Sequence, residues 1–180
     1  VSVGLEGMSS DRTSGLLRDR VETVEWDLAE IEKNGFSHYM LKEIFSQPES
    51  LTNAFLGRID LDEGTAHLGG LGLTPADMNA VQRIIITACG TSWHAALIGK
   101  YLIESLARVP VDVEYASEFR YRDFVISPRT IMFVISQSGA PADTLAALRA
   151  CRSRGCRVCG IVNVVGSTIA RETDAGVYIH

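Results

Sequence analysis

The chain has 180 residues, of which 46% are hydrophobic and 22% are charged, so its composition is that of a globular protein with a sizeable core. Its 17 Lys and Arg against 22 Asp and Glu give a net charge of −5, which argues against a general nucleic-acid binder, because such proteins need a basic surface. The longest apolar runs are only strand-sized and the first residues show no secretory signal, so we expect a cytoplasmic protein without a membrane span.

The part of the chain before Gln82 is polar and helical in tendency. Residues 1–20 are rich in Gly, Ser and Arg, and residues 1–25 are interpreted as a tail or linker. Alternating apolar residues predict a short strand at Val21–Asp27. Helical spacing of apolar residues predicts short helices, with Pro48 ending the first and Pro75 starting the last. These helices are expected at His38–Phe45, Gln47–Leu56 and Ala76–Val81.

From Arg83 onward, apolar β-branched runs alternate with helical stretches. This alternation predicts a parallel sheet covered on both faces, and therefore an α/β fold: a three-layer αβα sandwich of about five strands, flavodoxin-like, preceded by a short helical segment. The strands are expected at Arg83–Ala88, Val111–Tyr115, Thr130–Ile135, Arg157–Asn163 and Val177–Ile179. The helices are expected at Trp93–Leu106, from Ser117 to Arg120, from Pro141 or Ala142 to Arg154, and at Ser167–Glu172.

The four cysteines, Cys89, Cys151, Cys156 and Cys159, are interpreted as reduced structural thiols. Cys156 and Cys159 have the spacing of a metal or redox motif, but no second Cys or His pair lies at a ligand-like distance. Residues three apart on a strand also point to opposite faces. We therefore expect no metal and no cofactor.

Two strand ends carry the same signature, a small loop rich in hydroxyl groups that leads directly into a helix. Cys89-Gly90-Thr91-Ser92 follows the first strand and Ser136-Gln137-Ser138-Gly139 follows the third. Ligands of such sheets bind at the carboxyl ends of the strands, and a helix N-terminus there offers unpaired N–H groups to an anion. Neither loop contains Lys or Arg, so a phosphate would be held by neutral donors that allow it to leave again.

An alternative is that Thr91, Ser92 and Ser138 only cap their helices, a common use of these residue types. The two loops together leave the anion site and the caps about equally supported by physical chemistry alone. Neither the P-loop pattern nor the dinucleotide pattern G-x-G-x-x-G occurs.

Three other groups of residues have two interpretations each. The cluster of Arg149, Arg152, Arg154 and Arg157 is better explained by the end of a helix than by a nucleic-acid surface. Glu118, Arg120 and Arg122 are compatible with ligand contact or with structural ion pairs. His94 is compatible with the pocket or with the helix surface.

Four motifs follow one another along the chain: Ala88–Ser92, Ala116–Arg122, Ser136–Gly139 with Ala142–Leu145, and Asn163 with Gly166-Ser167. They closely resemble the first sugar-isomerase (SIS) domain of the glutamine–fructose-6-phosphate aminotransferase family. His38–Ile44 with Gln47-Pro48 resembles the entry into the isomerase half of that family. The resemblance runs from about Trp26 to His180.

The resemblance implies the sugar-phosphate-binding part of an enzyme that forms glucosamine 6-phosphate from fructose 6-phosphate and glutamine, in amino-sugar biosynthesis. It implies a sugar-phosphate site with Ser136 and Ser138 on the phosphate, and a homodimer formed through isomerase domains. The family's glutaminase Cys and its isomerisation residues (a Glu, a His and a Lys) have no counterpart here, so we assign no catalytic residue and expect this chain alone to be inactive. The site residues implied are Thr91, Ser92, Ser136, Gln137 and Ser138.

The resemblance also implies a division of the chain: 1–25 as a tail or the end of a glutaminase domain, 26–82 as a helical entry segment, and 83–180 as a first SIS domain cut short at its C-terminus. One departure stands out, because the family has Glu-Thr where this chain has Ala140-Pro141. Pro141 lacks the donors of a threonine, which predicts phosphate binding weakened about tenfold. It also keeps an alternative open, a non-catalytic SIS module that senses phosphosugars.

Overall fold

The computed structural model describes residues 33–179, so the tail and the strand predicted at Val21–Asp27 lie outside the described residues. The chain divides into two compact units, one ending at Ser46 and the other beginning at Gln47. In the first unit the rings of Phe36 and Phe45 stack with their centroids 5.6 Å apart. The second unit contains the sheet.

Helix α2 spans Tyr39–Phe55 without interruption and includes Pro48. The prediction that Pro48 separates two helices is therefore wrong. A proline removes one backbone hydrogen bond at a cost of about 3 kcal/mol, but the good helix formers on both sides of it keep the turns helical. One turn later, the Thr52 hydroxyl donates a hydrogen bond to the Pro48 carbonyl at 2.8 Å.

A small hairpin follows, in which β1 (Ile59–Asp60) pairs antiparallel with β2 (Thr65–Ala66). It was not predicted, because two-residue strands are too short to show a period. The short 3₁₀ helix η2 (Gly69–Leu71) and helix α3 (Pro75–Ala80) come next. Pro75 starts α3 as predicted, and Thr74 and Asp77 form a reciprocal capping box in front of it.

Five parallel strands form one sheet in the order β4-β3-β5-β6-β7, which confirms the predicted α/β fold. Their bounds agree with the predicted strands to within two residues at either end. The strands are β3 (Arg83–Ala88), β4 (Val111–Tyr115), β5 (Thr130–Ser136), β6 (Arg157–Val162) and β7 (Ala175–Tyr178). The intervening helices are α4 (Gly90–Leu106), α5 (Ala116–Phe119), α6 (Ala142–Arg152) and α7 (Thr168–Glu172).

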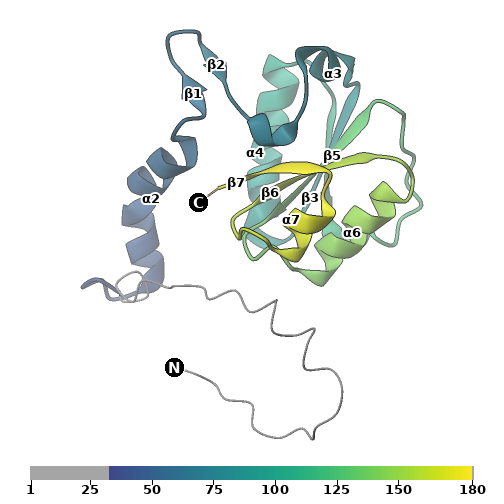
Figure 1. Cartoon of the computed structure of the whole chain (residues 1–180). Coiled ribbons are helices and arrows are strands. Elements are labelled where there is room, and N and C mark those ends of the chain that lie inside the picture. The colour runs from purple at the N-terminus through teal and green to yellow at the C-terminus, as the bar shows by residue number, and fades with distance from the viewer. Residues whose placement is uncertain (1–32, 180) are drawn as a thin grey trace, which may run out of the picture. The chain divides into compact units, whose positions relative to one another are not determined.

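Helices cover both faces of the sheet, with α6 and α7 on one side and α4 on the other (Figure 1). Alternate residues of each strand point to opposite faces. Ile85 of β3 therefore joins the larger core with Phe119 of α5 and Leu148 of α6, whereas its neighbour Ile86 packs with Ala96 of α4. This alternation explains the three layers.

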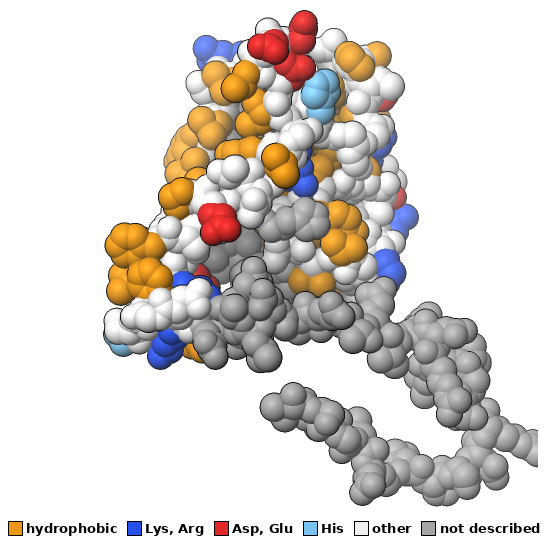
Figure 2. Space-filling model, turned by 60° about the vertical axis from the view of Figure 1, so that its left-hand side comes forward, with side chains coloured by type: hydrophobic (Ala, Val, Ile, Leu, Met, Phe, Trp, Pro, Cys, Tyr) orange, Lys and Arg blue, Asp and Glu red, His pale blue; other side chains and the backbone are white. Residues whose placement is uncertain are grey.

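Helix α4 also carries apolar side chains on its outer side. Ile98, Tyr101, Leu102 and Leu106 are exposed, at helical spacing. Hydrophobic side chains reach the surface in several separate groups on the face that Figure 2 shows, with charged side chains between them. The exposed side chains of α4 lie on one side of the helix, but nothing in the structure shows what covers them, so they do not by themselves identify a partner.

The strand order reverses between β3 and β5, because the chain goes from β3 to one neighbour, β4, and returns to the other side for β5. A crevice opens at the carboxyl ends of the two strands at such a point, since their connections leave in opposite directions. The two loops with hydroxyl side chains are the segments that follow β3 and β5.

Candidate functional site

The two loops leave the sheet side by side. Thr87 of β3 pairs with Val134 of β5 in the parallel register, so the residues that follow each strand emerge at the same edge. A direct contact also links the first loop to the helix after the second, because the Cys89 Sγ lies 3.9 Å from the Thr144 Oγ1. The sequence-predicted neighbourhood of the two loops is thus present in the fold.

The five predicted residues occupy two kinds of position. Thr91 and Ser92 lie in the first turn of α4, the former exposed and the latter half-buried. Ser136 is the last residue of β5 and is buried, with 4% of its surface exposed. Gln137 and Ser138 follow it in the loop and are exposed. Three of the four hydroxyl groups therefore remain accessible at the end of the sheet.

The alternative that these hydroxyl groups cap their helices is wrong. The N-cap of α4 is Cys89 and that of α6 is Pro141, and neither helix has a side-chain cap hydrogen bond. Helix α6 begins at Ala142, one of the two predicted starts, and Pro141 precedes it with φ −66° and ψ 130°. The N–H groups of both first turns therefore keep their capacity to bind an anion.

Two other helices show what a capped terminus looks like in this fold. The Thr74 hydroxyl accepts a hydrogen bond from the Asp77 N–H at α3, and the Ser167 hydroxyl accepts one from the Ala170 N–H at α7. Both lie outside the two loops. Helices α4 and α6, which follow β3 and β5, thus lack the side-chain caps that α3 and α7 have.

The loop after β5 is held in shape by its own hydrogen bonds. The Ser136 Oγ accepts from the Gly139 N–H at 2.9 Å, and the Gly139 carbonyl accepts from the Ile169 N–H at 2.9 Å. Gly139 has a φ of +73°, a conformation that favours glycine, and its Cα lies against the Ser167 side chain. Because it is bonded on both sides, the loop can present donors without first being ordered.

An ion pair lies next to this loop. Asp143, in the first turn of α6, accepts a hydrogen bond from the Arg120 guanidinium at 2.7 Å. That bond raises the pKa of Arg120 above its ordinary value. Sequence reasoning left the role of Arg120 open and missed Asp143. The available signal was the position of Asp143 near the loop, two residues after Pro141.

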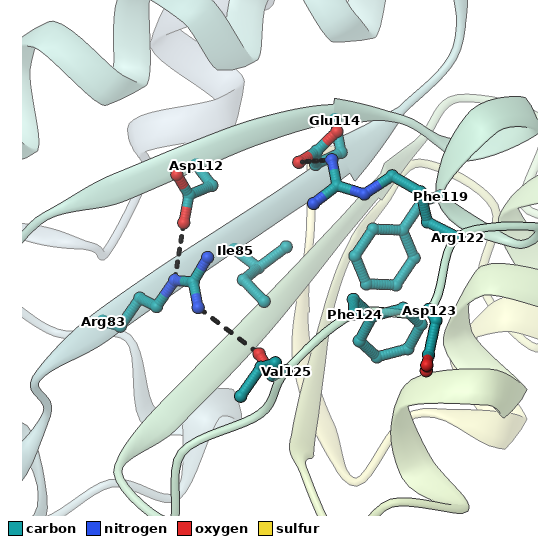
Figure 3. A pocket seen from close by; sticks show the side chains of 9 residues that line it. All are labelled: Arg83, Ile85, Asp112, Glu114, Phe119, Arg122, Asp123, Phe124 and Val125. Atoms are coloured by element: carbon teal, nitrogen blue, oxygen red, sulfur yellow. Dashed lines mark hydrogen bonds and ion pairs between the residues drawn. The ribbon is translucent and has the colours of Figure 1, made fainter.

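A hollow of about 220 Å³ lies elsewhere, beside strands β3 and β4 (Figure 3). Its charged side chains neutralise one another, since Arg83 bonds to Asp112 at 2.6 Å and Arg122 to Glu114 at 2.6 Å. None of the five predicted residues is among those that line it. Since its cations are already paired, we do not assign an anion to this hollow.

The basic cluster near the end of α6 is also engaged. Its guanidinium groups bind carboxylates or backbone carbonyls of neighbouring segments, which favours the helix-end interpretation over a nucleic-acid surface. The partners are Glu172 for Arg149, Asp174 for Arg152, Asp123 for Arg154, and the carbonyls of Leu71 and Gly72 for Arg157.

The cysteines are all free thiols, and Cys151, Cys156 and Cys159 are buried. A hydrogen bond with Cys156, together with burial, raises the pKa of the Cys151 thiol, and burial raises that of Cys159. Raised pKa values oppose thiolate chemistry at Cys151 and Cys159. Within residues 33–179, no group of three or more His, Cys, Asp or Glu side chains is arranged to hold a metal ion.

Comparisons with known proteins agree with the motifs. The model of the SIS domain family matches residues 78–180. The chain is 55% identical over 161 residues to a glutamine–fructose-6-phosphate aminotransferase [isomerizing] of Chlorobaculum tepidum, covering 89% of this chain and 26% of that protein. It is 47% identical over 180 residues to the enzyme of the same name from Bacteroides thetaiotaomicron, covering 100% and 29%. The resemblance predicted from the motifs is confirmed.

A solved structure shows the same arrangement. The C-terminal domain of glucosamine-fructose-6-phosphate aminotransferase from Francisella tularensis matches with a TM-score of 0.73 and 40% identity, over 82% of this chain and 41% of that one. The chain spans between a quarter and a third of the length of the curated relatives it matches. In the part of the chain from Lys33 to Ile179, no helix has the length and apolar character needed to cross a membrane.

Proposed function

Because the chain belongs to the SIS domain family, we propose that it is the sugar-phosphate-binding part of an enzyme that forms glucosamine 6-phosphate from fructose 6-phosphate and glutamine. The observation that carries this proposal is the pair of helix N-termini without side-chain caps at the switch point of the sheet. Hydroxyl side chains gather around them, and a phosphate group accepts hydrogen bonds from both kinds of donor.

In this proposal Ser136 and Ser138 bind the phosphate. The Ser136 Oγ already accepts from the Gly139 N–H, and its own hydrogen remains available for donation to a phosphate oxygen. Ser138 offers an exposed hydroxyl in the same loop, while Thr91 and Ser92 contribute from the first turn of α4. Gln137, with an exposed amide, binds a sugar hydroxyl.

The proposed role of this chain is binding rather than proton transfer. Isomerisation needs acid and base groups within reach of the C1 and C2 protons of the sugar, and no residue here is assigned that task. A site of neutral donors holds the dianion by hydrogen bonds alone, which favours exchange of substrate and product. The relatives at 47% and 55% identity are named as aminotransferases, so the alternative of a sensing module is not favoured.

Isothermal titration of the chain with fructose 6-phosphate tests the proposal, with fructose as the ligand that lacks the phosphate. We expect saturable heat at millimolar fructose 6-phosphate and none with fructose. Ser138→Ala should weaken binding by about ten- to a hundredfold, since a lost hydrogen bond to a charged group is worth about 1.5–3 kcal/mol.

The matched control is Ser153→Ala. Ser153 lies at the opposite end of α6, where its hydroxyl donates to the Ala150 carbonyl at 2.9 Å. The proposal fails if fructose 6-phosphate gives no heat, or if the two alanine variants bind it equally well.

Pro141→Thr tests the departure from the family motif. A threonine at this N-cap restores a backbone N–H and a hydroxyl beside the first turn of α6. We expect fructose 6-phosphate to bind about tenfold more tightly, by the worth of one or two added donors. Unchanged affinity would place the phosphate away from Pro141.

Three further parts of the proposal come from the sequence and from its resemblance to the family. They are a homodimer formed through isomerase domains, a cytoplasmic location, and the division of the chain at residues 25 and 82. Light scattering after size exclusion measures the mass of the assembly, and limited proteolysis followed by mass spectrometry locates the boundaries. A mass of one chain at all concentrations would contradict the dimer.

A further inference from the structure

Asp143 is a carboxylate in the first turn of the helix that would bind the phosphate. An acidic residue at this position interacts favourably with the helix dipole, so it suits the fold. It does not suit the ligand, because a carboxylate close to a phosphate repels it. Since neither loop carries Lys or Arg, nothing in the loops themselves offsets that negative charge.

Arg120 supplies the missing positive charge from a different element. Its guanidinium lies 2.7 Å from the Asp143 Oδ1, and the side chains are 32% and 42% exposed. Arg120 follows α5, which is anchored in the core by Ala116 and Phe119. The guanidinium also lies over the Tyr121 ring, 4.7 Å from its centroid. Two contacts thus hold the cation in front of the carboxylate.

We propose that Arg120 is a positioning residue that neutralises Asp143 beside the bound sugar phosphate, so that α6 can keep an acidic first turn without repelling its ligand. This inference rests on the proposed function. It assigns to the pair an electrostatic task in ligand binding, in addition to joining α5 to α6. Arg120 acts through Asp143 and is not required to touch the phosphate.

The expected size of the effect follows from Coulomb's law. At a site as exposed to solvent as this one, an unpaired carboxylate and a phosphate dianion within about 8 Å repel each other enough to change an affinity about tenfold, and salt reduces the repulsion further. Removing the charge of Arg120 should therefore weaken fructose 6-phosphate binding on the order of tenfold at low salt. The loss should shrink as salt is added.

A purely structural ion pair predicts a different pattern. If the pair only fixed α5 against α6, Asp143→Asn would be as harmful as Arg120→Gln, and the double variant would not recover. If Arg120 neutralises a charge, Asp143→Asn removes the need for it. The double variant Arg120→Gln with Asp143→Asn should then bind within about threefold of the unchanged chain, by the same Coulomb argument.

The experiment titrates fructose 6-phosphate into the full chain and its variants at low and at physiological salt. Arg122→Gln is the matched control, because Arg122 forms an equivalent ion pair with Glu114 from the same segment. Arg120→Lys keeps the charge and should bind nearly as well as the unchanged chain. Far-ultraviolet circular dichroism checks that each variant is folded. If Arg120→Gln is unfolded, the inference is tested with Arg120→Lys and the double variant.

Each outcome has one meaning. Weak binding by Arg120→Gln, recovery in the double variant and no loss in Arg122→Gln support the inference. Unchanged affinity in Arg120→Gln, a loss in Asp143→Asn as large as that in Arg120→Gln, or a double variant without recovery overturns it while the proposed function stands. No binding by the unchanged chain overturns both.

Discussion

Replacing Gly139 with alanine perturbs the candidate site in two separable ways. Gly139 has a φ of +73°, so any L-residue there adopts the left-handed conformation. A Cβ added at Gly139 would also lie closer to the Cβ and Oγ of Ser167 than real carbon atoms approach. The first effect belongs to the backbone alone, and the second depends on one neighbouring side chain.

The two effects differ in their expected size. The left-handed conformation costs an L-residue about 1–2 kcal/mol. The forced approach to Ser167 adds about 1–3 kcal/mol, the usual cost of inserting a methyl group into a packed site. Gly139→Ala should therefore lower the free energy of unfolding by about 2–5 kcal/mol. In a chain of 180 residues that corresponds to a fall in Tm of roughly 4–20 °C.

Gly155→Ala isolates the backbone effect. Gly155 has a φ of +79°, but nothing lies within 4 Å of an added Cβ. This variant should lose only about 1–2 kcal/mol. Urea unfolding followed by circular dichroism measures both variants, and equal m-values show that the free energies of unfolding can be compared.

A double variant then tests the contact itself. Ser167→Gly removes the obstructing side chain at a small capping cost of a few tenths of a kcal/mol. In combination with Gly139→Ala it should recover about 1–3 kcal/mol, measured as the coupling energy of a double-mutant cycle. Equal losses in Gly139→Ala and Gly155→Ala, or a coupling energy near zero, would refute the role of Ser167 in holding the loop.

Two further predictions concern the same region. Ser136→Ala leaves the buried Gly139 N–H without its acceptor, so we expect about 1–3 kcal/mol lower stability in urea unfolding together with weaker fructose 6-phosphate binding; unchanged stability would show that the bond does not hold the loop. Hydrogen bonding to Arg149 lowers the pKa of Glu172 below its ordinary value of 4.5, so the stabilisation is present above that value and is lost as the pH falls through the lowered pKa. Glu172→Gln should therefore lower Tm at pH 7 and have less effect at pH 3, measured by thermal unfolding; an effect that is constant with pH would contradict this linkage.

The strands could be predicted closely from the sequence because a parallel strand is buried on both faces. Arg83–Ala88 is predicted to the residue, since its apolar β-branched run ends at the small polar loop Cys89–Ser92. For the same reason, the sequence predicts that the two loops of the candidate site lie close together. Once strands and helices alternate, the carboxyl ends of two strands in one parallel sheet must meet at one edge.

What could not be predicted depends on backbone angles and on contacts between distant residues. The sequence contains Ser or Thr near the starts of α4 and α6, but the N-cap residues are Cys89 and Pro141, whose extended backbone immediately precedes each helix. Arg120 and Asp143 are 23 positions apart, so their pairing requires the packing of α5 against α6. Pro48 shows the opposite error, because a residue that usually ends a helix lies inside the long helix α2.

At the N-cap positions of α4 and α6, helix stability and anion binding make opposite demands on the same N–H groups. A capping side chain that has no hydrogen to donate, such as aspartate, at position 141 would accept hydrogen bonds from the first turn of α6 and stabilise the helix by about 1 kcal/mol, whereas a threonine hydroxyl can also donate to the ligand. The aspartate would thereby occupy the N–H groups that the proposed phosphate needs. Pro141 and Cys89 leave those groups free, so the helices that follow β3 and β5 give up this stabilisation. Since α3 and α7 are capped by Thr74 and Ser167, the capping chemistry is available to this fold and is withheld where the ligand is proposed to bind.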